Sequence, residues 1–291
     1  MKYTRLIAVV LTLCLLLTGC GGASSETQGD TVVATTYPMY YLCRRLTDGM
    51  EGVNVEALIT EEVSCLHDYT VTTTQMRLID GADLVVMSGA GLEHFMESVL
   101  ETLPAEKLVD SSVGIQLIGD DPHIWMDPER YAQQGDNIAS ALSEKYPDQK
   151  HIIESNAQIL RQELLELKAK KTELLSALDQ TNIITFHDGF TYFADAFGLT
   201  ILAAIEEEEG ADPSAAEIRE ICDLIEKYEL KTVYTEKNGA TNAAGIIVEE
   251  FAAKNRPVHM GTLSMVMSPT EGGYLVEMQQ NIDVIIREET R

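Results

Sequence analysis

The chain has 291 residues, of which 47 are acidic and 21 basic, so its formal net charge at pH 7 is −26. Such an acidic chain argues against nucleic-acid binding, which relies on basic patches, and against electrostatic docking on anionic lipid. The same negative field raises the local concentration of cations. The length suits two compact lobes or one large domain.

The first twenty residues are typical of an export signal. A basic start precedes an apolar run from Leu6 to Leu17, and this run is shorter than the roughly twenty residues of a membrane-spanning helix. It ends in Leu17-Thr18-Gly19-Cys20, which resembles the signal of a bacterial lipoprotein, whose cysteine is acylated. We therefore expect an extracytoplasmic protein that is lipid-anchored to the bacterial cell membrane, with a signal peptide at 1–19, the lipid on Cys20 and a flexible tether at 20–30.

Short β-branched strands alternate with amphipathic helices after the tether. This alternation predicts parallel sheets built from βαβ units. We predict strands at 31–36, 53–59, 83–87 and 107–110. We predict helices at 39–50 (just after Pro38), 72–80, 92–102 and 128–145.

The middle of the chain, residues 148–178, contains no glycine or proline and is rich in leucine, glutamate, lysine and glutamine. At about 1.5 Å per residue, a helix of this length would extend for roughly 45 Å. We interpret it as a rigid spine between two lobes. Its apolar residues are spaced three and four apart, which predicts one buried helix face made of Ile153, Ala157, Leu160, Leu164 and Leu167.

The alternation of strands and helices resumes after this helix. We predict strands at 182–186, 199–203, 232–234 and 257–260, and helices at 190–197, 213–228 (capped by Asp212), 240–254 and 273–287. The sequence therefore predicts an α/β fold of two lobes, each with a parallel sheet flanked by helices, joined by one long rigid helix. The expected divisions are an N-terminal lobe at 31–147, a linker helix at 148–179 and a C-terminal lobe at 180–291.

Three of the six histidines follow predicted strands. His67, His123 and His187 each lie in a loop or turn after a strand, where parallel α/β sheets bind their ligands. Two precede the long helix and one follows it, so they could converge on a cleft between the lobes. Asp68, Asp121, Asp127 and Asp188 are close enough in sequence to orient the rings. We interpret the remaining histidines, His94, His151 and His259, as structural.

Several motifs surround these histidines: VVATTYPM at 32–39, HDY at 67–69, GAGLE at 89–93, DPHIWMDP at 121–128 and HDGFTYF at 187–193. Together they resemble the zinc and manganese solute-binding lipoproteins of bacterial ABC importers, the cluster with a helical backbone. The resemblance covers nearly all of the mature chain, and DPHIWMDP is its most specific motif. It implies that His67, His123 and His187 bind a metal ion as cargo, which a membrane ABC permease then receives.

The sequence departs from this family in three places. Cys65 and Leu66 stand where the family commonly has Asp-Pro before its first histidine, and no stretch rich in histidine and acids precedes Asp121. The family's fourth ligand is usually an aspartate after the last strand, in a Leu-Asp pair, but here the matching pair is Leu263-Ser264. Glu236, at the exit of the 232–234 strand, is the best-placed substitute; water, Ser264 or an acid from 206–209 are the other candidates.

Three imidazoles with at most one carboxylate favour zinc over manganese, because zinc accepts nitrogen donors in tetrahedral geometry while manganese prefers oxygen-rich sites. An open fourth position would also suit a secreted zinc-dependent hydrolase, although no H-E-x-x-H motif is present. A chelate-binding or adhesive lipoprotein of the same architecture is the other alternative. We expect a monomer that captures its ion by small lobe shifts. With Cys20 acylated, Cys43, Cys65 and Cys222 remain, so at least one thiol stays free or pairs between molecules.

Overall fold

The computed structural model describes residues 29–61, 66, 69–205 and 214–291. Among these residues, no helix is both long enough and apolar enough to cross a membrane. Several predicted features lie outside the described residues: the signal peptide, Cys20, Cys65, His67, Asp68, the acidic run 206–209 and Asp212.

The described strands form two four-stranded parallel sheets, which confirms the predicted fold class. The first sheet has the order β2-β1-β3-β4 and the second the order β6-β5-β7-β8, so the two halves share one topology. The sequence contains no detectable internal repeat that would predict this shared strand order. The strands are β1 Asp30–Ala34, β2 Val53–Ala57, β3 Leu84–Met87, β4 Leu108–Asp110, β5 Asn182–Phe186, β6 Thr200–Ala204, β7 Thr232–Glu236 and β8 His259–Leu263.

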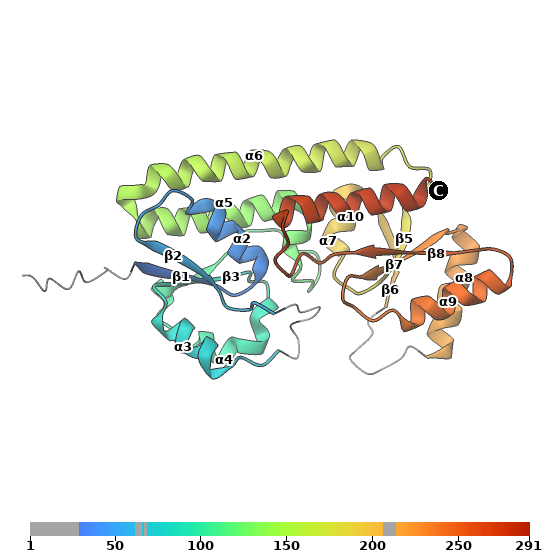
Figure 1. Cartoon of the computed structure of the whole chain (residues 1–291), viewed down its shortest axis with the longest axis horizontal. Helices are drawn as coiled ribbons and strands as arrows, with labels where there is room; N and C mark the ends of the chain where they lie inside the picture. The colour runs from blue at the N-terminus through green and yellow to red at the C-terminus, as the bar shows by residue number, and fades with distance from the viewer. Residues whose placement is uncertain (1–28, 62–65, 67–68, 206–213) are drawn as a thin grey trace, which may run out of the picture.

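Helices flank both sheets (Figure 1). The α-helices are α2 Tyr37–Leu46, α3 Thr73–Gly81, α4 Glu97–Leu100, α5 Pro128–Lys145, α6 Lys150–Leu175, α7 Thr191–Phe197, α8 Ala215–Tyr228, α9 Asn242–Ala253 and α10 Gly273–Glu289. The 3-10 helices are η1 Leu92–Met96, η2 Ala105–Lys107, η3 Ile124–Met126 and η4 Pro147–Gln149.

Side-chain hydrogen bonds explain where several helices begin. Thr72 and Gln75 form a capping box at the start of α3, and Ser214 forms another with Glu217 at the start of α8. Ser214, rather than the predicted Asp212, is therefore the cap of α8. The helix predicted at 92–102 is instead divided into η1 and α4, and the backbone is non-helical at Glu93 and Met96. The Glu93 carboxylate accepts hydrogen bonds from Thr35, Ser88 and Gly89, which follow the central strands β1 and β3.

The long helix α6 lies along both halves of the molecule (Figure 1). It has 26 residues, fewer than predicted, because a separate 3-10 turn precedes it and its last turn ends at Leu175. Its predicted apolar face is buried at Ile153, Leu160 and Leu164. It packs on α2 and α5 of the first half and on α7 and α10 of the second.

Helix α10 adds a second connection between the halves. It follows β8 in the chain yet packs on α2 as well as on α6. Consequently, one hydrophobic cluster runs from Val32 in β1 to Ile285 in α10 and contains side chains from both sheets. The two halves therefore share a core, and a wide opening between them would expose apolar surface.

The described cysteines are not cross-linked: Cys43 and Cys222 are buried free thiols. Burial raises the pKa of Cys43 to about 12. A thiol that stays protonated is a poor nucleophile and a poor metal ligand, so Cys43 is a core side chain.

Candidate metal centre

Two of the predicted ligands emerge at the centre of the second sheet. His187 directly follows the last residue of β5, and Glu236 is the last residue of the neighbouring strand β7. In the order β6-β5-β7-β8, the chain changes direction between β5 and β7, and open α/β sheets bind ligands at this switch point. The strand predicted at 232–234 is two residues longer in the structure, so Glu236 belongs to the sheet and not to the following loop.

The side chains of His187 and Glu236 lie next to each other. Nδ1 of His187 is 3.2 Å from Oε2 of Glu236, and only 4% of the Glu236 side chain is exposed. Burial raises the pKa of Glu236 to about 8. In the metal-free protein this carboxyl group therefore holds a proton at neutral pH, and a nearby cation would favour its ionised form.

Asp121 holds the ring of His123 from the first half of the chain. Its Oδ1 accepts a hydrogen bond from the His123 backbone N–H at 2.8 Å and lies 2.7 Å from Nδ1 of the ring. Burial raises the pKa of Asp121, but the hydrogen bonds that its carboxylate accepts from the His123 ring and backbone lower the pKa by more, so the net shift is downward. An ionised carboxylate only accepts hydrogen bonds, so Nδ1 carries the proton and Nε2 keeps its lone pair for a metal.

Asp127 has a structural task instead. Its carboxylate caps α5 through the Glu129 backbone N–H and accepts hydrogen bonds from Arg130 and Lys168. Because Lys168 is in α6, Asp127 ties the DPHIWMDP segment to the long helix rather than orienting a histidine.

The fold brings His123 and His187 together from opposite halves of the chain. Their ring centres are 5.7 Å apart, and the rings are inclined by 78°. Among the residues with described positions, no group of three or more His, Cys, Asp or Glu side chains is arranged to hold a metal ion. His67, the third predicted histidine, is not among them.

Gly189 leaves room for the His187 ring. A Cβ at this position would lie 2.7 Å from Cδ2 and 2.8 Å from Nε2 of His187, and 2.6 Å from the methyl group of Met265. Any side chain at position 189 would therefore displace the ring. In the sequence this glycine is only one residue of the HDGFTYF motif, because a steric role depends on what packs against it in the folded chain.

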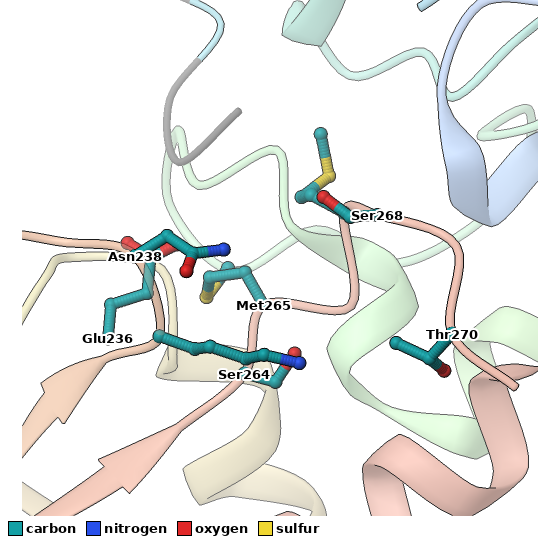
Figure 2. A pocket seen from close by; sticks show the side chains of 8 residues that line it. Glu236, Asn238, Ser264, Met265, Ser268 and Thr270 are labelled. Atoms are coloured by element: carbon teal, nitrogen blue, oxygen red, sulfur yellow. The ribbon is translucent and has the colours of Figure 1, made fainter. Parts of the chain in front are cut away.

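The residues that line a small pocket beside Glu236 come from the ends of β7 and β8 (Figure 2). Glu236 pairs with Leu263 in the register of these strands, so Ser264 comes next to it. The Ser264 hydroxyl accepts a hydrogen bond from the Val266 backbone N–H at 3.1 Å. Asn281 holds the Ser264 main chain through two hydrogen bonds of 2.7 Å. Of Glu236 and Ser264, the two candidates for the fourth ligand, only Glu236 has a carboxyl group.

The chain is similar to a known protein family and to several known proteins. The family described as "Zinc-uptake complex component A periplasmic" (ZnuA) matches residues 32–288. The zinc-binding lipoprotein AdcA of Streptococcus pneumoniae (strain ATCC BAA-255 / R6) is 27% identical over 308 aligned residues, which cover 97% of this chain and 60% of AdcA. The chain thus spans about three fifths of the length of that relative.

Two solved structures are similar over nearly their whole length. The Zn(II)-bound ZnuA-like domain of Streptococcus pneumoniae AdcA is 25% identical with a TM-score of 0.76, and the match covers 90% of this chain and 100% of that one. The laminin-binding protein Lbp of Streptococcus pyogenes is 26% identical with a TM-score of 0.75, covering 90% and 99%. The chain therefore belongs to the ZnuA family of periplasmic zinc-uptake components.

Proposed function

We propose that this protein captures a zinc ion outside the cytoplasm, in the cleft between its two halves, and delivers it to a membrane ABC permease. The observation that carries the proposal is the approach of two predicted ligands, His123 and His187, from opposite halves of the chain, with Glu236 beside His187. His187 and Glu236 lie 3.2 Å apart in the second half, and the His123 ring from the first half lies 5.7 Å from the His187 ring.

These separations suit a tetrahedral zinc site. With zinc–ligand bonds of about 2.0–2.1 Å, two donor atoms of one tetrahedron are about 3.3 Å apart, and the centres of two bound imidazoles are about 5 Å apart. The observed distances, 3.2 Å and 5.7 Å, are close to these values. We assign His67, His123 and His187 as ligands, with Glu236 as the substitute for the aspartate that the family usually has where Ser264 stands here.

The donor set favours zinc over manganese. Three imidazole nitrogens and one carboxylate satisfy a four-coordinate zinc ion, whereas manganese favours more oxygen donors and a higher coordination number. Glu236 also supplies the negative charge that a divalent cation needs in a site where water is scarce, since its side chain is 4% exposed.

The same donor set favours binding over catalysis. A catalytic zinc site keeps one position open for water or substrate. With Glu236 as the proposed fourth ligand no position stays open, so we assign a transport role without catalysis rather than a hydrolytic one. A chelate-binding or adhesive role does not require histidines from both halves to converge.

The N-terminal sequence indicates where in the cell the protein binds its ion. We propose acylation of Cys20 after removal of residues 1–19, a tether at 20–30, lobes at 31–147 and 180–291, and a linker helix at 148–179. A monomer confined to the membrane face that carries the permease gains effective concentration for the hand-over of its ion.

A competition titration of metal-free protein against a chromophoric zinc chelator tests the proposal. We expect one zinc ion per chain. His123→Ala and His187→Ala should each weaken binding by more than about 100-fold, because losing a ligand costs more than losing a group that only orients one. Glu236→Gln should weaken it by about 10- to 100-fold, because the amide keeps an oxygen but not the charge.

His94→Ala is the matched control, since the His94 side chain is 80% exposed and contacts only Glu97 among the ion pairs of the described residues. This variant should bind zinc as the wild type does. If the wild type bound no stoichiometric zinc, or if the three site variants bound it unchanged, the assignment would be wrong. Zinc-dependent hydrolysis that His123→Ala abolishes would instead favour the enzyme.

A further inference from the structure

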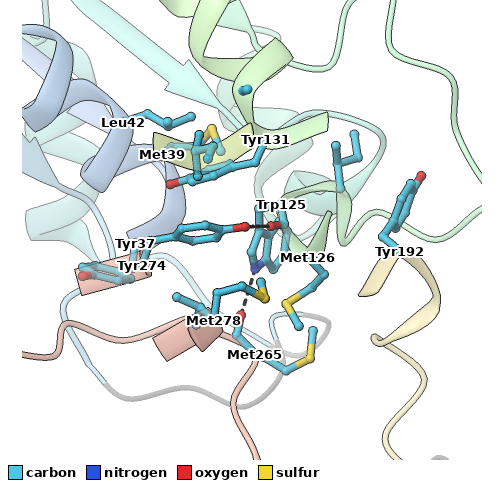
Figure 3. Close-up of a cluster of buried hydrophobic side chains, with 14 of the residues drawn as sticks. Tyr37, Met39, Leu42, Trp125, Met126, Tyr131, Tyr192, Met265, Tyr274 and Met278 are labelled. Carbon is cyan, nitrogen blue, oxygen red and sulfur yellow. Dashed lines mark hydrogen bonds between the residues drawn. The ribbon is translucent and has the colours of Figure 1, made fainter. Parts of the chain in front are cut away.

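Trp125 joins the segment that carries His123 to the second half of the molecule. It is the single tryptophan of the chain and is fully buried. Its indole Nε1–H donates a hydrogen bond of 2.8 Å to the carbonyl oxygen of Met265, 140 residues away (Figure 3). Its own carbonyl oxygen accepts a hydrogen bond of 2.6 Å from the hydroxyl of Tyr274 in α10.

A chain of contacts through Trp125 connects the two histidines of the site. The His123 ring packs edge-on against Trp125, with ring centres 5.2 Å apart. Trp125 is hydrogen-bonded to the main chain of Met265. The methyl group of Met265 and the His187 ring both lie against Gly189, where a Cβ would be 2.6 Å from the methyl group and 2.7 Å from the ring. The position of His123 is therefore linked to that of His187 by direct contacts, without a metal ion.

The loop after β8 presents the Met265 carbonyl in a fixed orientation. Asn281 of α10 bonds both main-chain groups of Ser264, and the Ser264 hydroxyl accepts from the Val266 backbone N–H. Val266 has a φ of +57°, a left-handed conformation that a β-branched residue rarely adopts. Such a conformation persists only where the surrounding contacts hold it, so this loop is a rigid support.

We infer that Trp125 is a positioning residue that sets the separation of His123 and His187 through its hydrogen bond to Met265. This inference rests on the proposed zinc site. The loop after β8 carries Ser264 in place of the family's usual aspartate, so this loop supplies no carboxylate to the site. We assign it a supporting role instead: its Met265 carbonyl oxygen accepts the hydrogen bond from Trp125. Ligands that are held in place before the ion arrives lose less freedom on binding, which strengthens binding and fixes the coordination geometry.

The test compares Trp125→Phe with Tyr131→Phe in the full-length protein. Trp125→Phe keeps an aromatic ring beside His123 but removes the indole N–H. Tyr131→Phe also removes one fully buried aromatic donor, because the Tyr131 hydroxyl donates 2.6 Å to the carbonyl oxygen of Pro38. That bond leads to α2 and not to the loop. The Phe ring keeps the stacking of position 131 on Tyr274, whose ring centre is 4.1 Å away, so the control loses a similar bond but keeps the contacts around Trp125.

Zinc affinity by chelator competition and the visible absorption spectrum of the Co(II)-loaded protein are the readouts, with thermal unfolding as a measure of stability. We expect Trp125→Phe to weaken zinc binding by about 10- to 100-fold and to change the Co(II) ligand-field bands. Tyr131→Phe should lower the unfolding temperature but leave zinc affinity and the Co(II) spectrum unchanged. Equal losses of affinity in both variants, or no change in Trp125→Phe, would overturn the inference while leaving the zinc site itself intact.

A second measurement needs no variant. Because Trp125 is the single tryptophan, its indole N–H gives one resonance in a proton–nitrogen spectrum of the wild type. We expect this resonance to be protected from solvent exchange and to shift when zinc saturates the protein. A resonance that zinc does not move would overturn the inference even if Trp125→Phe failed to fold. A wild-type protein that bound no zinc would overturn the proposed function as well.

Discussion

The groups closest to His187 explain why this ring is a good candidate ligand. Glu236 faces its Nδ1, and Gly189 leaves space for the opposite edge of the ring. Both residues act on the same imidazole. Glu236 places a buried carboxyl group beside it, and Gly189 has no side chain that would displace it. The glycine two residues after His187 and the carboxyl group at the end of the neighbouring strand β7 therefore form one unit with this histidine.

Zinc affinity should depend on pH in two stages. Burial raises the pKa of Glu236 to about 8, so below that pH zinc must displace its proton, and affinity should rise with pH until about 8. Imidazole ligands must be neutral to bind zinc, so competition with protons adds a steeper loss in acid, with zinc released at about pH 5. Competition titrations across this range measure both stages.

Glu236→Gln separates the two stages. The variant has no carboxyl proton to displace, so its zinc affinity should be nearly flat between about pH 7 and 8, while the loss at lower pH remains. If the wild-type affinity did not change with pH, neither the histidines nor Glu236 could be ligands.

At the scale of secondary structure, the long helix α6 supports the first half of the site. Lys168 of α6 reaches Asp127, which caps α5 just after the segment that carries His123. Leu160 lies close to Gly135 of α5, where a Cβ would be 3.9 Å from a methyl group of Leu160. The apolar face predicted from three- and four-residue spacing is thus the face that holds α6 against its neighbours.

Two adjacent residues of α6 test this packing. Leu160 is 2% exposed, so Leu160→Ala should lower the free energy of unfolding by about 2–5 kcal/mol through lost burial and a cavity. Its neighbour Ile159 is 51% exposed, so Ile159→Ala should change stability by less than about 0.5 kcal/mol. Denaturant unfolding of both variants gives the values; similar losses would mean that α6 is not packed by this face.

For the whole molecule, the shared core limits how far the halves can move. One hydrophobic cluster includes both sheets, and α6 and α10 each contact both halves. The hydrogen bond from Trp125 to Met265 adds a polar connection close to the site. We therefore expect capture by small shifts and local rearrangement rather than by wide hinge closure.

Small-angle X-ray scattering of metal-free and zinc-loaded protein measures this directly. The radius of gyration should change by less than about 1 Å, the scale typical of preorganised binding sites. A decrease of several ångströms on zinc loading would mean that the shared core separates in the metal-free state. Zinc-loaded His123→Ala, which lacks a donor from the first half, is the control for nonspecific effects of the ion.

The amino-acid sequence by itself determined the alternation of strands and helices, the long apolar face of α6, and the positions of His123 and His187 after strands. These features follow from local spacing and composition, and the structure contains them. The inward turn of the Glu93 carboxylate within the predicted helix could not be predicted, because its partner Thr35 lies 58 residues away.

Only the tertiary structure decided which of the side chains at the strand ends lie next to each other. Glu236 lies beside His187 because β7 pairs with β5, and Ser264 lies beside Glu236 because β8 pairs with β7 in one particular register. The role of Trp125 depends on an acceptor 140 residues away. Local sequence specifies which side chains stand at the ends of strands, whereas strand order and register, which depend on long-range packing, specify which of them meet.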